Sequence, residues 1–161
     1  MYSKVANTYS LYVKSLKART TMRLLDHYPL VTTPRLRECR DFYMRHFGFE
    51  PAFESSWFVL LQRAPAEGEA AISLAFMSPE HPSMPPGPEP FGGLGLIYTL
   101  QVEDAQACEA ELRAAGAAIS YALRREPWGQ IRFQCLDPSG LVLDICQQVE
   151  PQAGFWDPYM I

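Results

Sequence analysis

The side chains that most often carry chemistry are sparse in this sequence and do not stand at a known catalytic spacing. The 161 residues contain three histidines and four cysteines, Cys39, Cys108, Cys135 and Cys146, with no Cys-x-x-Cys pair. Nucleophile-elbow, phosphate-loop and dinucleotide-binding motifs are missing. A cysteine nucleophile needs an activating base, which no spacing here supports. We therefore assign no catalytic residue and expect four buried, reduced thiols, with a disulfide or a metal cluster as the alternatives.

Composition and charge exclude several classes of protein. The chain is 48% hydrophobic and 20% charged, as in ordinary globular domains. No apolar run approaches the roughly 18 residues of a membrane span, so we expect no membrane insertion. A formal net charge of -4 argues against nucleic-acid binding. The first residues also lack the apolar core of a signal peptide, so the expected location is cytoplasmic.

Both ends of the chain differ from its body. Residues 1–24 form a basic N-terminal extension without an acidic residue before Asp26. Its apolar side chains recur at helical spacing, which is compatible with a targeting peptide, a surface-binding helix or a helix docked on the acidic body. Alternatively, Met22 is the true start and the extension has no role. Residues 151–161 form an aromatic tail that we expect to fold back on the body or on a partner subunit.

The body contains one arrangement of elements twice. Each half shows a strand, an amphipathic helix ended by a glycine, and three further strands. The expected ranges are strand 28–33, helix 35–47 and strands 49–54, 57–63 and 70–77, then strand 94–102, a helix capped by Asp104 and running to 115, and strands 118–124, 130–136 and 141–147. A proline-rich linker, 78–93, separates module one (25–77) from module two (94–150). This order predicts an α+β fold with helices on one face of each sheet.

Several short motifs support a family resemblance. Phe42-Tyr43 followed by Phe47-Gly48-Phe49, and later Glu126-Pro127-Trp128-Gly129 and Asp137-Pro138-Ser139-Gly140, stand in the expected places. Together they resemble the glyoxalase/bleomycin resistance protein/extradiol dioxygenase superfamily, the vicinal oxygen chelate proteins, over residues 25–150. The resemblance implies two βαβββ modules that form an open, incomplete barrel around a cleft. It also implies a homodimer, with modules paired within one chain or between two.

The metal site of that superfamily is mostly lost here. The resemblance places the four ligand positions at Tyr28, at Ser73 or Ala75, at Ile97 and at Asp144. Of these positions, only Asp144 carries a carboxylate that could bind a metal. His27 would supply a second ligand only if the first strand were shifted by one residue. A catalytic centre needs about three protein ligands. We therefore expect no metal and no cofactor, and expect Asp144 to be a hydrogen-bonded polar group in the cleft.

The cleft lining follows from strand alternation. If Asp144 points into the cleft, strand alternation also directs Ile97, Thr99 and Gln101 into it. The residues directed toward the helices are then Leu96, Leu100, Leu141, Leu143 and Ile145. The face that holds Arg132 and Gln134 stays open at this point. Trp57 and Trp128 are cleft candidates, with a packing role as the alternative. The expected ligand-binding residues are Tyr28, Leu30, Thr32, Trp57, Ile97, Thr99, Gln101, Trp128 and Asp144.

Three functions are compatible with this lining. The first is a metal-independent binding protein of the bleomycin-resistance type, which sequesters a toxic or antibiotic-like small organic ligand. The alternative is a vicinal-oxygen-chelate enzyme, such as a lyase, isomerase or dioxygenase, with a rearranged metal site. The third is a dimeric partner-binding module that uses the two tails. Fold resemblance alone does not choose among them.

Overall fold

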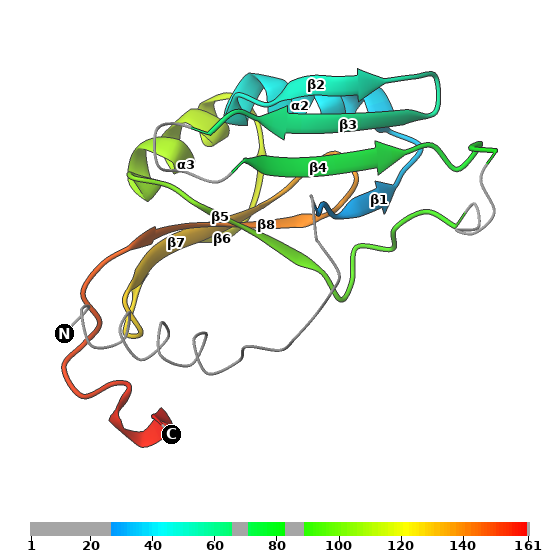
Figure 1. The fold of residues 1–161 in the computed structure, drawn as a ribbon. Helices are drawn as coiled ribbons and strands as arrows, with labels where there is room; N and C mark the ends of the chain where they lie inside the picture. Colours follow the sequence, from blue (N-terminus) through cyan, green and yellow to red (C-terminus); the bar gives the residue numbers. More distant parts are fainter. Residues whose placement is uncertain (1–26, 66–70, 83–88, 161) are drawn as a thin grey trace.

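The computed structural model describes residues 27–65, 71–82 and 89–160, so the basic N-terminal extension lies outside the described residues. Two modules with the same order of strands and helix follow each other along the chain (Figure 1). The elements are β1 (Leu30–Thr32), α2 (Leu36–Phe47), β2 (Glu50–Glu54), β3 (Phe58–Arg63), β4 (Ile72–Met77), β5 (Ile97–Gln101), α3 (Ala105–Ala114), β6 (Ala118–Glu126), β7 (Gln130–Leu136), β8 (Val142–Gln148) and a final 3-10 turn, η1 (Asp157–Tyr159).

Each module forms one four-stranded sheet, and the two sheets share one topology. The strand orders are β1-β4-β3-β2 and β5-β8-β7-β6. In each sheet the first strand pairs in parallel with the last, and the other neighbours are antiparallel. Neither sheet closes into a barrel within the described chain. The expected α+β architecture of two open βαβββ units is confirmed.

Local sequence signals account for both helices. Helix α2 buries Leu36, Cys39 and Tyr43, which lie on one face at helical spacing. It ends at Gly48, whose φ of 64° is the left-handed conformation that glycine adopts without strain. At the start of α3, the Asp104 side chain accepts a hydrogen bond of 2.9 Å from the backbone N–H of Ala107. These caps and ends agree with the sequence-based expectations.

The alternation expected for the second sheet is also present. Leu100, Leu143 and Ile145 are buried, whereas Thr99 on the other face of β5 is exposed. One assignment is wrong: Leu96 is 40% exposed instead of packing beneath the helices. The physical reason is its position, because β5 begins only at Ile97 and Leu96 is not held by the ladder to β8.

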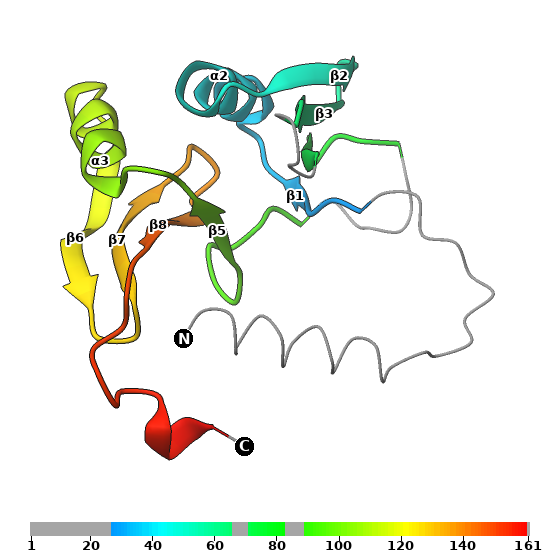
Figure 2. The same cartoon turned by 60° about the vertical axis from the view of Figure 1, so that its left-hand side comes forward.

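One hydrophobic core serves both modules. Tyr43 and Phe76 of the first module belong to the same buried cluster as Phe133, Leu143 and Ile145 of the second. Figures 1 and 2 show α2 and α3 at the same side of the molecule. The modules are therefore packed together through apolar side chains, which stabilises their relative placement.

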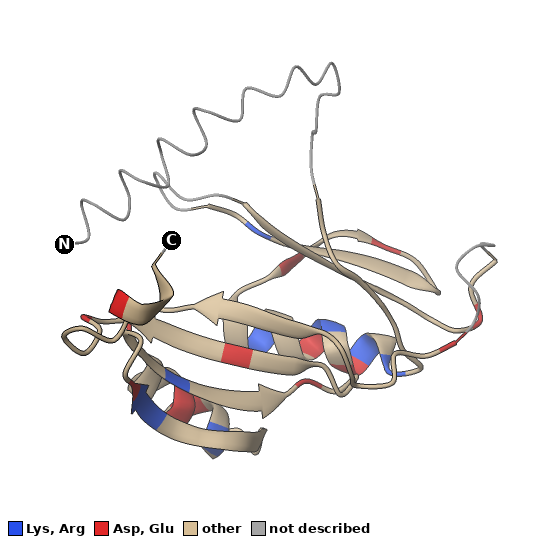
Figure 3. Cartoon of the chain, turned by 90° about the horizontal axis from the view of Figure 1, so that it is seen from below, with Lys and Arg blue, Asp and Glu red and all other residues tan. Residues whose placement is uncertain are grey.

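Charged residues occur on both helices and on several strands. Figure 3 shows arginines and carboxylates on α2 and α3, and strand β6 carries Arg124, Arg125 and Glu126. Among the described residues, no helix has the length and hydropathy needed to cross a membrane.

Candidate functional site

The open face of the second sheet, meaning the face that carries Thr99, Arg132, Gln134 and Asp144, gathers polar side chains from neighbouring strands. The ladders place Asp144 of β8 directly opposite Thr99 of β5 on one side and Gln134 of β7 on the other. Directly paired residues point to the same side of a sheet. Arg132 is two residues from Gln134 on β7 and shares this face. The question left open by the sequence is settled: Arg132 and Gln134 lie on the Asp144 face.

Asp144 accepts hydrogen bonds from two donors at one of its oxygens. Its Oδ1 accepts a hydrogen bond of 2.8 Å from Nη1 of Arg132 and another of 2.8 Å from Nε2 of Gln134. Nε of Arg132 donates to Oε1 of Glu126 over 3.1 Å. Asp144 is 7% exposed and Glu126 is 8% exposed, so both carboxylates are buried. One guanidinium therefore compensates two buried negative charges.

Aromatic rings flank this guanidinium. The Arg132 carbon Cζ lies 5.0 Å from the ring centre of Tyr121 and 5.2 Å from that of Trp128. The Tyr121 hydroxyl donates to Oε1 of Glu126 over 2.8 Å, and the indole N–H of Trp128 donates to Gln130 over 2.8 Å. Each ring is thus oriented by a hydrogen bond as well as by contact with the cation.

The charges of the open face cancel locally. A second guanidinium, that of Arg124, stands opposite Arg132 on the neighbouring strand, and its Cζ lies 4.3 Å from the ring centre of Tyr121. Burial lowers the pKa of Arg132, but hydrogen bonds and charge from Asp144 and Glu126 outweigh this effect and raise its pKa. The guanidinium therefore stays charged at every physiological pH. The face offers stacking rings and hydrogen-bonding groups with little net charge.

The residues here do not fit the divalent metal that the family resemblance implies. Tyr28 and Ile97 stand at two of the expected ligand positions, and Asp144 already accepts hydrogen bonds from a guanidinium and an amide. Within the described residues, no group of three or more His, Cys, Asp or Glu side chains is placed to hold a metal ion. The guanidinium of Arg132, in place of a metal ion, supplies the positive charge that neutralises Asp144.

The structure distributes the other expected ligand-binding residues over both sheets. Ile97, Thr99 and Gln101 are exposed on β5, on the open face beside Asp144. Tyr28 and Leu30 are 44% and 42% exposed at the start of β1, in the first sheet. Thr32 follows them on β1 and is half-buried.

Trp57 and Trp128 belong to different modules. Trp57 precedes β3 and contacts Phe58, with ring centres 5.9 Å apart, whereas Trp128 joins the Asp144 network through Arg132. Sequence reasoning missed Tyr121, Arg124 and Gln130. Their signal is weak, because the register of β6 is interrupted on both sides of Tyr121 and alternation fails there.

The aromatic tail packs against the end of the second sheet that carries Trp128. It therefore folds back on the body, which is one of the two placements expected for it. Phe155 contacts Trp128 with ring centres 6.2 Å apart, and the indole N–H of Trp156 donates to the Trp128 carbonyl over 3.1 Å. The backbone N–H of Gln152 donates to the Pro127 carbonyl over 2.8 Å. The tail therefore holds the turn that presents Trp128.

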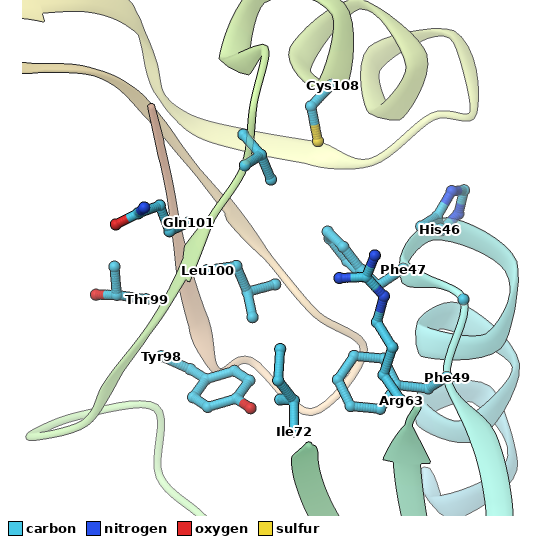
Figure 4. A pocket seen from close by; sticks show the side chains of 12 residues that line it. His46, Phe47, Phe49, Arg63, Ile72, Tyr98, Thr99, Leu100, Gln101 and Cys108 are labelled. Atoms are coloured by element: carbon cyan, nitrogen blue, oxygen red, sulfur yellow. The ribbon is translucent and has the colours of Figure 1, made fainter. Parts of the chain in front are cut away.

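A separate hollow, here called the seam pocket, lies between the two modules. Its volume is about 530 Å³, and its walls come from the end of α2 and the two residues after it, the end of β3, the start of β4, β5 and α3. Figure 4 shows Leu100 and Tyr98 pointing toward it, while the side chains of Thr99 and Gln101 lie on the other side of β5. Thr99 and Gln101 also border the pocket, although their side chains lie on the other side of β5, so the pocket and the open face share this strand.

All four cysteines are free thiols, as expected, but the expectation that all four are buried is wrong for Cys108. Cys39, Cys135 and Cys146 are buried, and Cys108 is half-buried and borders the seam pocket. Burial raises the pKa of Cys135 to about 12 and also raises the pKa of Cys108. High thiol pKa values oppose nucleophilic catalysis.

Solved structures share this fold at low sequence identity. A glyoxalase/bleomycin resistance protein/dioxygenase from Nocardioides is 19% identical over 91% of this chain and 97% of its own, with a TM-score of 0.64. Lactoylglutathione lyase from Agrobacterium tumefaciens is 15% identical over 78% of this chain and 94% of its own, with a TM-score of 0.58. An antibiotic binding protein from Streptomyces is 27% identical over 79% of this chain and 99% of its own, with a TM-score of 0.52.

No curated protein matches the sequence. A family model, however, matches most of it, and the matched part spans both modules and ends within β8. The chain belongs to the Glyoxalase/Bleomycin resistance protein/Dioxygenase superfamily, whose model matches residues 24–145.

Proposed function

We propose that this protein binds a small, planar organic ligand on the open face of the second sheet and does so without a metal. The observation that carries the proposal is the hydrogen-bonded pair of Arg132 and Asp144, at 2.8 Å. A carboxylate paired with a guanidinium in this way is a poor ligand for a metal, because the positive charge of Arg132 repels a cation at the same group. The function that remains is recognition of an organic molecule by ring contact and hydrogen bonds.

The charge balance of the face indicates the class of ligand. The guanidinium of Arg132 is already paired with both carboxylates and that of Arg124 lies over the Tyr121 ring, so a charged ligand gains little from an additional ion pair. Trp128 and Tyr121 provide aromatic surfaces, and Gln130 and Gln134 provide amide groups beside them. A neutral, conjugated molecule with carbonyl or hydroxyl oxygens matches this combination. Sequestration of a toxic or antibiotic-like compound in the cytoplasm is the role we propose for such binding.

We further propose that a second copy of the chain completes the cleft. Four large apolar residues have 42% to 87% of their surface exposed: Tyr28 just before β1, Leu30 on β1, Leu94 in the segment before β5, and Ile97 on β5. Exposed apolar patches of this kind favour association, and homodimers commonly have two-fold symmetry. The experiment is light scattering during size-exclusion chromatography, with twice the 18.2 kDa chain mass expected. Ile97→Glu should give monomers, whereas Met44→Glu on the outer side of α2 should not.

Ligand binding is tested by tryptophan fluorescence with 1,4-dihydroxyanthraquinone, a neutral planar quinone, as the probe. We expect saturable quenching in the wild type and a loss of about tenfold or more in affinity for Trp128→Leu. Trp57→Leu is the matched control, since it removes a tryptophan from the other module. Absence of saturable quenching, or equal loss in both variants, would contradict the proposal.

The metal question has its own measurement. Thermal unfolding with Mn²⁺, Ni²⁺, Zn²⁺ or Fe²⁺ should show no saturable increase in Tm, because a ligand that binds only the folded state must raise its stability. A saturable increase that disappears in Asp144→Asn would favour the enzymatic alternative with a rearranged metal site.

A further inference from the structure

The seam pocket is large enough for a small molecule and is separate from the open face of the second sheet. Its volume of about 530 Å³ lies within the range of roughly 300–1,000 Å³ that is common for ligand sites. Tyr98 and Leu100 point into it, whereas Thr99 points to the opposite side of β5 (Figure 4). A ligand in the seam pocket would therefore touch neither Arg132 nor Asp144, and the pocket is independent of the proposed function.

The walls of the pocket are mainly apolar. Phe47 and Phe49 come from the first module, as does Ile72, and Leu100 and Val102 come from the second. Figure 4 shows the side chains of Phe47, Phe49 and Ile72 facing a common space with that of Leu100. Apolar surface of this kind gains free energy when a hydrophobic group covers it.

One positive charge stands at this apolar space. Arg63, the last residue of β3, extends toward the middle of the pocket in Figure 4. His46 also borders the pocket. Burial and the nearby charge of Arg45 lower the pKa of its imidazole, although Glu111 opposes them, so the ring is neutral near pH 7. No carboxylate side chain is among the residues that line the pocket. Within the described part of the chain, Arg63 has no ion pair.

A guanidinium beside an apolar cavity selects for an anion with an apolar body. The planar fork of arginine matches a carboxylate in a two-bond arrangement, and the hydrogen bonds are charge-assisted. The Tyr98 hydroxyl adds a neutral donor on the wall of the second module, since burial raises its pKa and keeps it protonated.

We propose that the seam pocket binds a small carboxylic acid with an aryl or alkyl tail, with its carboxylate on Arg63 and its tail against Phe47, Phe49 and Leu100. Such a ligand contacts both modules at once. Its binding would stabilise the seam between them, because it adds contacts that only the assembled modules provide.

The test compares an acid with its neutral analogue on the full chain. Titration calorimetry with 4-phenylbutyrate and 4-phenylbutanol should show about tenfold or more tighter binding of the acid. Arg63→Gln should remove this preference while still binding the alcohol, and Arg37→Gln, on the exposed side of α2, should behave as wild type. Circular dichroism confirms that the variants are folded.

A second measurement locates the bound acid. Cys108 borders the pocket and is the least buried of the four thiols, so 4-phenylbutyrate should slow its alkylation by N-ethylmaleimide, followed by peptide mass spectrometry. Trp128→Leu should leave this protection unchanged, which separates the pocket from the open face. The proposal is overturned if acid and alcohol bind equally, if Arg63→Gln binds the acid as the wild type does, or if no binding occurs up to about 10 mM.

Discussion

The hydroxyl of Tyr43 donates a hydrogen bond of 3.0 Å to Oδ2 of Asp137, and this bond crosses from one module to the other. Tyr43 lies on α2 and is completely buried, and Asp137 begins the turn between β7 and β8. Oδ1 of the same carboxylate accepts hydrogen bonds from the backbone N–H groups of Ser139 and Leu141 and from the Ser139 hydroxyl. A single buried carboxylate thus shapes a turn of the second module and anchors a helix of the first.

Loss of the Tyr43 hydroxyl should weaken the seam. Tyr43→Phe leaves the ring in place and removes one hydrogen bond from a buried carboxylate, which is expected to lower the free energy of unfolding by about 1–3 kcal/mol. Urea unfolding measures the change. Tyr159→Phe, at a ring that is 66% exposed, is the control and should change stability by less than about 0.5 kcal/mol. Equal effects in both variants would show that the seam bond contributes nothing.

Asp137 should make stability depend on pH in a defined direction. Burial raises its pKa above the ordinary value of 3.8, although hydrogen bonds from Ser139, Leu141 and Tyr43 oppose this. A carboxyl whose pKa is higher in the folded state contributes stability below pH 3.8, and the contribution is lost as pH rises through the folded pKa. The advantage of the wild type over Asp137→Asn should therefore shrink as pH rises from about 4. Urea unfolding at several pH values measures it, and an advantage that grows would contradict the raised pKa.

Arg132 should be essential to the stability of the open face. Arg132→Met leaves Asp144 and Glu126 buried near each other without their cation, which should destabilise the fold by about 3 kcal/mol. Adding Asp144→Asn to that variant should restore part of the loss, with a coupling of about 1 kcal/mol or more between the two sites. Thermal unfolding of the four proteins of this cycle measures the coupling. Arg124→Met is the matched control, since Arg124 contacts the Tyr121 ring at an exposed position and should matter little.

Gly129 should tolerate no side chain. Its φ is 104°, and a Cβ there would lie 2.8 Å from the carbonyl oxygen of Val149 and 3.1 Å from the nitrogen of Pro151. Gly129→Ala should therefore cost about 2 kcal/mol or more. Gly95→Ala isolates the backbone effect, because Gly95 also has a positive φ of 79° but nothing lies within 4 Å of the added carbon. Its expected cost is about 1 kcal/mol, so similar thermal shifts in the two variants would contradict the close contact.

Much of the fold is predictable because its signals are local. Alternating side chains identify the strands, Gly48 ends α2 through its left-handed backbone, and Asp104 caps α3. The duplicated order of elements then predicts two sheets of one topology. The family motifs independently indicate the same fold of two βαβββ modules.

The network around Asp144 was not predictable in the same way. It depends on the register that sets Gln134 opposite Asp144, and a shift of one residue in the β7–β8 hairpin would turn Arg132 and Gln134 to the other face. It also depends on irregularities in β6 that bring both Tyr121 and Arg124 to Arg132. Alternation carries no information on either feature. The seam pocket was equally hidden, because it results from the packing of two modules and not from any one element.

The shared core determines how the chain comes apart. Phe76 and Phe133 belong to one buried cluster although they come from different sheets, so neither sheet can lose its packing while the other keeps its own. Heating should therefore give one calorimetric transition whose van't Hoff and calorimetric enthalpies agree. The duplicated chain has the form of two units, but in thermodynamic terms it is one cooperative domain.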